Sequence, residues 1–176
     1  MIIFVDEKIE ILRDNCNNLR DRAMIDFLLS TGIRVGELVR LNIDDIDFSE
    51  RECVVHGKGD KERKAYFDAK TKIHLLNYIE SRTANNIALF VSLNKPHSRL
   101  TESGVELRLR EMGKKLGVEK VHPHKFRRTM ATRAIEKGMP IEQVQKILGH
   151  EQIDTTLRYA MVNQNNVKLS HRKYIS

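Results

Sequence analysis

The sequence has few cysteines and no long apolar run. Its 176 residues include only Cys16 and Cys53, which excludes a disulfide-stabilised scaffold and a cysteine-rich zinc module. No stretch approaches the roughly 20 apolar residues that a transmembrane helix needs, and the first residues lack the apolar segment of a signal peptide. These absences exclude membrane, secreted and fibrous proteins. Two thiols suit a reducing cytoplasm, where we expect the protein to be located.

Repeats, low-complexity tracts and linkers rich in proline, glycine or serine are also absent. With 40% apolar and 31% charged residues, the chain has the composition of a folded protein, and it is long enough to bury a core. We therefore expect one compact domain over residues 1–176.

The net charge of +7 is spread unevenly along the chain. Residues 1–50 carry 6 Lys and Arg against 11 Asp and Glu, whereas residues 99–133 carry 10 against 4, and residues 157–176 carry 4 against none. A basic region that follows an acidic start suggests one face built for a polyanion. Taken alone, this pattern fits an ordinary solvated basic surface equally well.

Apolar spacing and capping residues predict a mostly helical chain. Asp6 is expected to be the N-cap of a first helix, with Ile9, Ile11 and Leu12 on its inner side. A later helix, which Asp68 should cap, is expected to bury its apolar residues, namely Ile73, Leu75, Leu76 and Ile79. Other helices are predicted at about 19–30, ending at Thr31-Gly32, around 35–39, from Thr101 to near Gly117, from Pro123 to Gly138, from Pro140 to Gly149, and more weakly near 155–161 and 165–170.

Between the helix predicted around 35–39 and the helix that Asp68 should cap, the spacing of the apolar residues changes. Brief apolar segments at 46–48, 54–55 and 65–67 indicate three short antiparallel strands, the last two joined by a glycine-containing hairpin. The predicted fold class is therefore α+β, mainly α-helical, with one small three-stranded antiparallel sheet.

Arg34 lies in the segment TGIRVGEL, at a predicted helix start just after a glycine turn. This position presents its guanidinium together with unpaired backbone N–H groups, an arrangement that binds anions. The alternative is a surface arginine paired with Glu37, one turn further along the helix.

Lys58 lies in the segment GKGDKER, at the tip of the predicted hairpin. A lysine there can reach a phosphate backbone, because the neighbouring glycines allow close approach. The alternative is a charged edge loop that only discourages strand pairing. A nucleotide-binding P-loop is excluded, since its glycine and lysine spacing is absent.

His124 and Arg127 lie in the segment HPHKFRRT, three residues apart at a predicted helix start. They share one helix face where the dipole favours an anion, so an imidazole and a guanidinium can meet one anionic group. A zinc site formed by His122, His124 and His150 is disfavoured, because it needs further ligands and lacks the spacing of a zinc-binding helix.

Two further residues are less specific on their own. His150 directly follows a helix-ending glycine in LGH, so it can donate to an anion, although such a histidine more often caps helix carbonyls. Tyr159, in TTLRYA, lies in a weak helix, and a lone tyrosine is usually a half-buried packing residue.

In order and spacing, these five segments together resemble the catalytic domain of the tyrosine recombinase (phage-integrase-like) family. They run from Thr31 to Ala160, and the likeness is greatest to integrases of conjugative transposons. The segment KFRRT departs from the family's common L-R-H-T, with Arg128 in place of a frequent histidine outside the catalytic set. Family members also carry N-terminal core-binding and arm-binding domains, so the resemblance implies that residues 1–176 are a catalytic-domain fragment.

The resemblance implies an enzyme for site-specific DNA recombination, such as integration or excision of a mobile element, through a 3′-phosphotyrosyl intermediate. Tyr159 is then the nucleophile, and no cofactor or metal is implied. The other implied catalytic residues are Arg34, Lys58, His124, Arg127 and His150.

The implied partner is double-stranded DNA, bound by a homotetramer of the full-length protein, and a monomeric free fragment is compatible with this. No membrane is involved. Two alternatives remain open at this point: a helix-turn-helix DNA-binding module without chemistry, and strand cleavage of the type IB topoisomerase kind, which does not pair two DNA sites.

Overall fold

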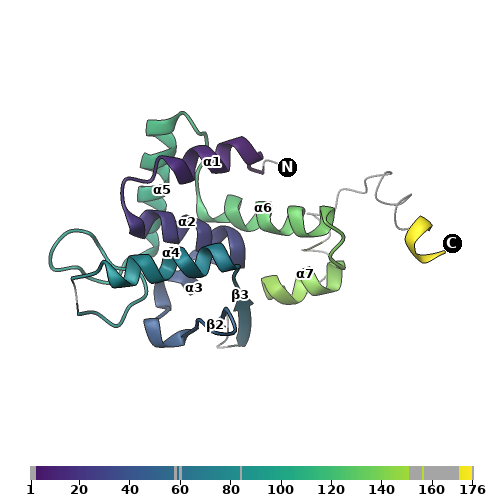
Figure 1. Ribbon diagram of the computed structural model, residues 1–176, viewed down its shortest axis with the longest axis horizontal. Helices are drawn as coiled ribbons and strands as arrows, with labels where there is room; N and C mark the ends of the chain where they lie inside the picture. Colours follow the sequence, from purple (N-terminus) through teal and green to yellow (C-terminus); the bar gives the residue numbers. More distant parts are fainter. Residues whose placement is uncertain are drawn as a thin grey trace.

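The computed structural model describes residues 3–57, 59, 61–83, 85–150, 156 and 171–175. Its elements surround a central helix, α2, and α6 and α7 project together from one side of the molecule (Figure 1). The elements follow the chain in the order α1 (Asp6–Asp14), α2 (Leu19–Thr31), α3 (Val35–Arg40), the 3-10 turn η1 (Ile43–Asp45), β1 (Ile46–Asp47), β2 (Glu52–His56), β3 (Glu62–Tyr66), α4 (Ala69–Glu80), α5 (Glu102–Leu116), α6 (Pro123–Glu136) and α7 (Ile141–Leu148).

Helix α2 is the centre of the fold, and it is buried on nearly every side, charged residues such as Asp21 and Asp26 included. It packs against α4 and α6, and its fully buried side chains include Met24, Phe27 and Leu28. Asn18 accepts a hydrogen bond from the backbone N–H of Asp21 at its start, and Gly32, in the left-handed conformation with φ +62°, ends it.

The sheet has the order β1-β2-β3, and both pairings are antiparallel, as the sequence predicts. One face of the sheet turns inward and buries Cys53, Val55 and Ala65. Arg63 pairs with Val55 across β2 and β3, and alternation along the strand places it in the same inward row as Ala65. A charged side chain therefore faces the interior of the domain.

Most predicted helix ends are confirmed by hydrogen bonds. The side chain of Asp68 accepts from the N–H of Thr71 at 2.8 Å, and that of Thr101 accepts from the N–H of Gly104 at 3.1 Å. The predicted N-cap at Asp6 is wrong, because Val5 holds that position with an extended backbone and Asp6 is the first helical residue. As a first-turn carboxylate, Asp6 still has the favoured sign of charge for that end of a helix.

Two predicted core positions are also wrong. Ile11 on α1 and Ile73 on α4 are exposed, with 36% and 56% of their surface accessible. On α4 the inward positions belong to Thr71, Leu75 and Tyr78 instead. The weak helices predicted near 155–161 and 165–170 fall outside the described residues, apart from Thr156.

The apolar side chains form two cores of unequal size. The larger core runs from Phe4 to Phe126 and includes residues of α1 to α6 and of the sheet. The smaller one consists of Ala131, Val144 and Leu148, between the second half of α6 and α7. The two ends of α6 thus belong to different cores. Among the described residues, no helix is long and apolar enough to span a membrane.

Candidate functional site

Arg34 is the residue just before α3, where the extended chain enters the helix. The carboxylate of Glu37 accepts hydrogen bonds from the Arg34 backbone N–H at 2.7 Å and from Arg34 Nη1 at 3.1 Å. The pairing considered as the alternative therefore exists, but its carboxylate is buried, with 1% of the side chain exposed, whereas 40% of the Arg34 side chain is exposed. A buried anion thus fixes a half-exposed guanidinium.

Arg127 lies in the first half of α6 and is buried. Its Nη1 donates to the carbonyl of Gly32 and its Nη2 to the carbonyl of Leu148, each at 2.6 Å. Both are charge-assisted hydrogen bonds to carbonyls at helix ends, where the backbone has acceptors to spare. Arg127 consequently connects the end of α2 to the end of α7.

His150 follows Gly149, whose φ of +62° turns the chain at the end of α7. The ring Nδ1 of His150 lies 2.8 Å from Oγ1 of Thr156, so the ring does not cap helix carbonyls through that nitrogen. Arg127 binds the carbonyl of Leu148. The next carbonyl along the chain, that of Gly149, accepts a hydrogen bond from Arg34 Nη2 at 3.3 Å. The Arg34 and Arg127 guanidiniums therefore donate to consecutive carbonyls just before His150.

The environment of His150 disfavours its protonated form. Burial lowers the pKa of His150 to about 4, and the positive charges of Arg127, Arg34 and Arg63 act in the same direction. The ring is therefore neutral near pH 7 and can donate one hydrogen bond to an anion without a charge of its own.

Arg63 was not among the residues singled out from the sequence. Its Nη2 donates to Oε2 of Glu37 at 2.7 Å, so that one carboxylate joins Arg63 and Arg34. The side chain also lies against Gly149, since a Cβ there would be 2.5 Å from Arg63 Nε. A sequence signal existed, because Arg63 is two residues before the buried Ala65 on one strand.

Arg34, Arg63 and Arg127 form what we call the cationic cluster. Arg34 and Arg63 share the carboxylate of Glu37, whereas Arg127 donates to the carbonyls of Gly32 and Leu148, so the three cations bond to one carboxylate among the described residues. Burial lowers the pKa of Arg63 below its usual value, with the charge of Arg34 adding to that effect against the opposing effect of Glu37. Three guanidiniums gathered in this way favour an anion beside them.

His124 lies in the first turn of α6, three residues before Arg127, and it is exposed. Its ring centroid is 6.4 Å from that of His122. Burial lowers the pKa of His122, and the neighbouring His124 lowers it further. Both imidazoles lie at a helix N-terminus, where the partial positive charge favours an anion.

Two predicted site residues, Lys58 and Tyr159, lie outside the described residues. The base of the hairpin that carries Lys58 is described: Gly57 N–H donates to the carbonyl of Lys61 at 2.9 Å. A Cβ on Gly57 would lie 3.7 Å from Oε1 of Glu37, so this base is adjacent to the carboxylate that joins Arg34 and Arg63.

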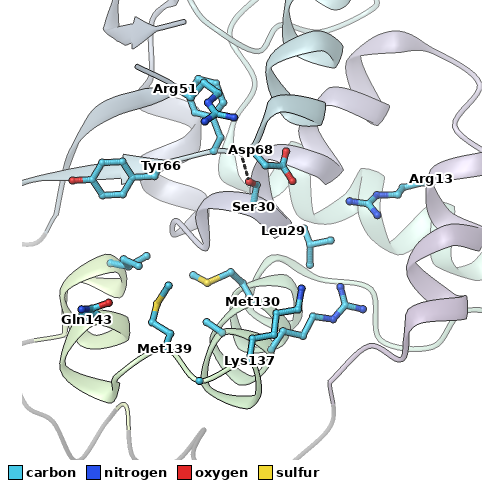
Figure 2. A pocket seen from close by; sticks show the side chains of 15 residues that line it. Arg13, Leu29, Ser30, Arg51, Tyr66, Asp68, Met130, Lys137, Met139 and Gln143 are labelled. Atoms are coloured by element: carbon cyan, nitrogen blue, oxygen red, sulfur yellow. Dashed lines mark hydrogen bonds between the residues drawn. The ribbon is translucent and has the colours of Figure 1, made fainter. Parts of the chain in front are cut away.

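One cavity lies away from the cationic cluster. It has a volume of about 820 Å³ and lies between the end of α2, the end of β3, and α6 and α7. Figure 2 shows Leu29, Met130 and Met139 around it, with Arg51 and Lys137 at its edge. None of Arg34, His124, Arg127 and His150 lines it. Among the described residues, no group of three His, Cys, Asp or Glu side chains is placed to hold a metal ion.

The fold is that of a known family. The model of the phage integrase family matches residues 5–166, and the chain belongs to that family. The tyrosine recombinase XerC of Staphylococcus aureus (strain JH9) is 37% identical over 175 residues, covering 94% of this chain and 58% of that protein. The chain therefore spans little more than half the length of the curated relatives it matches.

Solved structures of recombinases share the fold. The crystal structure of XerA recombinase has a TM-score of 0.84 and 32% identity, covering 99% of this chain and 64% of that one. The Tn1549 transposon integrase in complex with transposon right end DNA has a TM-score of 0.83 at 20% identity, covering 99% of this chain and 66% of that one. The second match places the likeness to transposon integrases at the level of the fold.

Proposed function

We propose that this chain is the catalytic domain of a site-specific tyrosine recombinase, which cleaves and rejoins double-stranded DNA in the cytoplasm. The observation that carries the proposal is the cationic cluster beside the neutral His150, which has the charge that a phosphodiester requires. The likeness to XerC and XerA, both described as recombinases, supports the same conclusion.

In the proposed reaction, the phenolic oxygen of Tyr159 forms a bond to the backbone phosphorus, and the bond from phosphorus to the 5′-oxygen breaks. The product is a 3′-phosphotyrosyl link and a free 5′-hydroxyl. Because one phosphoester replaces another, a 5′-hydroxyl from a second strand can reverse the step and rejoin the DNA. No nucleotide triphosphate is consumed.

The phosphate oxygens are the proposed ligands of Arg34 and Arg127, whose guanidiniums stabilise the charge of the pentacoordinate transition state. The neutral ring of His150 donates a further hydrogen bond to the phosphate. The burial of Glu37 and Arg127 supports this assignment, since groups held in one orientation need little rearrangement during the reaction.

Two protons move in this scheme. The phenol of Tyr159 has an ordinary pKa of about 10, so it transfers its proton as it attacks, and His124 is the proposed acceptor. Lys58 is the proposed donor to the 5′-oxygen. Its place next to Gly57, which lies beside Glu37, supports a position near the cluster.

A non-catalytic DNA-binding module is the rival function. Trapping of a covalent product on DNA distinguishes the two. The probe is a pool of duplexes with a randomised centre and a nick, from which the short 5′-hydroxyl strand diffuses away after cleavage. We expect a detergent-resistant adduct with wild-type protein and none with Tyr159→Phe, which removes only the nucleophilic oxygen. The proposal fails if wild type forms no adduct, or if Tyr159→Phe forms one at the wild-type rate.

The duplex that is recovered from this pool as a covalent adduct is called the selected duplex. It then tests how the full-length protein assembles on DNA. We propose a homotetramer of the full-length protein on two DNA sites, as recombination requires, whereas the type IB topoisomerase alternative acts on one site. Exchange of strands between two differently labelled selected duplexes by the full-length protein supports recombination. Relaxation of supercoiled DNA without such exchange supports the topoisomerase alternative.

A further inference from the structure

Arg63 has a position that the proposed chemistry does not use. It reaches Glu37 from β3, while Arg34 reaches the same carboxylate from the start of α3. Two guanidiniums and one backbone N–H therefore share two carboxylate oxygens. Because Glu37 is buried, water cannot take the place of any of these donors at low cost.

The other two nitrogens of the Arg63 guanidinium, Nε and Nη1, do not account for the position of Arg63 by stabilising the fold. Nε and Nη1 are buried and have no hydrogen-bond partner among the described residues. Buried donors without partners are unfavourable, and a buried cation that shares its carboxylate partner with another cation gains little from that pairing. An arginine in such an unfavourable position is better explained by a role in the functional site than by a role in stabilising the fold.

Arg63 also sets a distance across the site. Its Cδ and Nε lie so close to Gly149 that a Cβ there would be 2.6 Å and 2.5 Å away, respectively. Gly149 in turn supplies the carbonyl that binds Arg34 Nη2, and His150 follows it. Arg63 thus contacts Glu37, which binds Arg34, and Gly149, which precedes His150.

From these contacts we infer that Arg63 is a positioning residue, which holds the Arg34 guanidinium and the Gly149-His150 segment at the spacing that one phosphate requires. The inference rests on the proposed function. By sharing the charge of Glu37, Arg63 also leaves more of the Arg34 charge available to the phosphate. Without Arg63, Glu37 would neutralise Arg34 alone, and Gly149 would lose the side chain against which it packs.

The test compares single-turnover adduct formation by wild type, Arg63→Met and Arg63→Lys on the duplex selected above. Met keeps the apolar stem of the side chain without its charge, whereas Lys keeps the charge as a single point donor. We expect Arg63→Met to slow cleavage roughly 10- to 100-fold, less than the roughly 10²- to 10³-fold that follows loss of a direct transition-state contact, because Arg63 acts through Arg34. Arg63→Lys should give an intermediate rate. The matched control is Lys64→Met, on the next residue of the strand, whose side chain is 55% exposed and pairs with Glu52.

A second substrate separates positioning from folding. A methylphosphonate at the scissile position replaces one charged oxygen by a methyl group, so less charge has to be stabilised. If Arg63 acts through the charge and position of Arg34, the slowing by Arg63→Met should shrink to within about threefold on this substrate, as expected once the phosphate charge is removed. The affinity for uncleaved DNA should stay close to that of wild type.

Equal slowing on both substrates, or a rate equal to that of the Lys64→Met control, overturns the inference and leaves the proposed function intact. If Arg63→Met does not fold, Arg63→Lys carries the same comparison, with a smaller slowing that again shrinks on the methylphosphonate. Absence of any adduct with wild type overturns the proposed function, and the inference with it.

Discussion

The two halves of the candidate site rest on supports of unequal strength. Arg34, Glu37 and Arg63 belong to elements that pack on the larger core. His150 follows α7, whose buried residues Val144 and Leu148 belong to the smaller core. The difference indicates a fixed half, which packs on the larger core, and a second half whose position depends on few apolar contacts.

Arg127 connects the two halves. It lies next to Phe126, which belongs to the larger core, and its two hydrogen bonds reach the end of α2 and the end of α7. The start of α6 is further fixed by Thr129, whose hydroxyl accepts from the N–H of Phe4 at 3.0 Å. The smaller core is thus attached to the larger one through a residue of the site itself.

The largest expected effect comes from the fixed half. Arg34→Lys should slow adduct formation about 10²-fold or more, corresponding to about 3 kcal/mol of transition-state stabilisation, and nearly as much as Arg34→Ala. A lysine cannot reproduce the bonds to Glu37 and Gly149 while also binding a phosphate in two places. Single-turnover cleavage measures this effect. Wild-type cleavage by Arg34→Lys would reduce Arg34 to a structural partner of Glu37.

A paired substitution compares the two cores. Leu148→Ala and Leu28→Ala each remove a fully buried leucine, which typically lowers the free energy of unfolding by about 2–5 kcal/mol. We expect Leu148→Ala to reduce hydrogen-exchange protection in α7 alone and to slow cleavage roughly tenfold, since local opening separates His150 from the cluster. Leu28→Ala should lower the midpoint of thermal unfolding of the whole domain, with a normal rate per folded molecule. The division into halves is contradicted if Leu148→Ala lowers the unfolding midpoint of the whole domain while Leu28→Ala loosens α7 alone.

A smaller effect is expected on the titration of His150. Arg63→Met should raise the pKa of His150 from about 4 toward its ordinary value of 6.5, because it removes one of the three cations that depress it. Burial, the main cause of the depression, remains, so the pKa should stay below 6.5. Chemical shifts of the His150 ring against pH measure this. An unchanged pKa would mean that Arg63 does not act on the second half.

The smallest effect is on stability. A histidine whose folded pKa lies below its unfolded value binds its proton less readily in the folded state, so the free energy of unfolding should fall as pH drops from about 6.5 toward about 4. Urea unfolding at several pH values measures the slope, and His150→Gln should reduce it. An identical slope in both proteins would mean that His150 titrates normally.

The sequence predicted helix ends where the signal is a local hydrogen bond. Asp68 and Thr101 cap helices as expected, because each needs only the backbone N–H three residues further on. The cap at Asp6 was misplaced by one residue, since Val5 satisfies the backbone geometry without a side-chain bond. Such one-residue choices depend on tertiary packing rather than on local pattern.

The sequence was a poorer guide to which apolar residues become buried. Ile73 lies outside because α4 turns Tyr78 inward instead. Tyr78 stacks on Phe90 with ring centroids 5.6 Å apart, and its hydroxyl accepts from the N–H of Val91 at 3.2 Å. Phe90 lies in a segment without regular helical or strand spacing, so no pattern on α4 alone could reveal this partner.

Within the site, Arg34, Arg127 and His150 lie close together, and their catalytic roles stay predictions from the sequence. Arg63 was missed because its proximity to Glu37 depends on how β3 packs against the start of α3 and against α7, which the sequence does not state. The roles of Lys58 and Tyr159 stay predictions from the sequence, since both lie outside the described residues.

The proposed geometry is tested most directly by a structure of the Tyr159→Phe protein bound to the uncleaved selected duplex. We expect one backbone phosphate within hydrogen-bond distance, about 2.7–3.2 Å, of Arg34 from the fixed half, of Arg127, which connects the halves, and of His150 from the second half. A phosphate contacted by only one half, or a DNA backbone that passes over the cavity of Figure 2 instead, would contradict it.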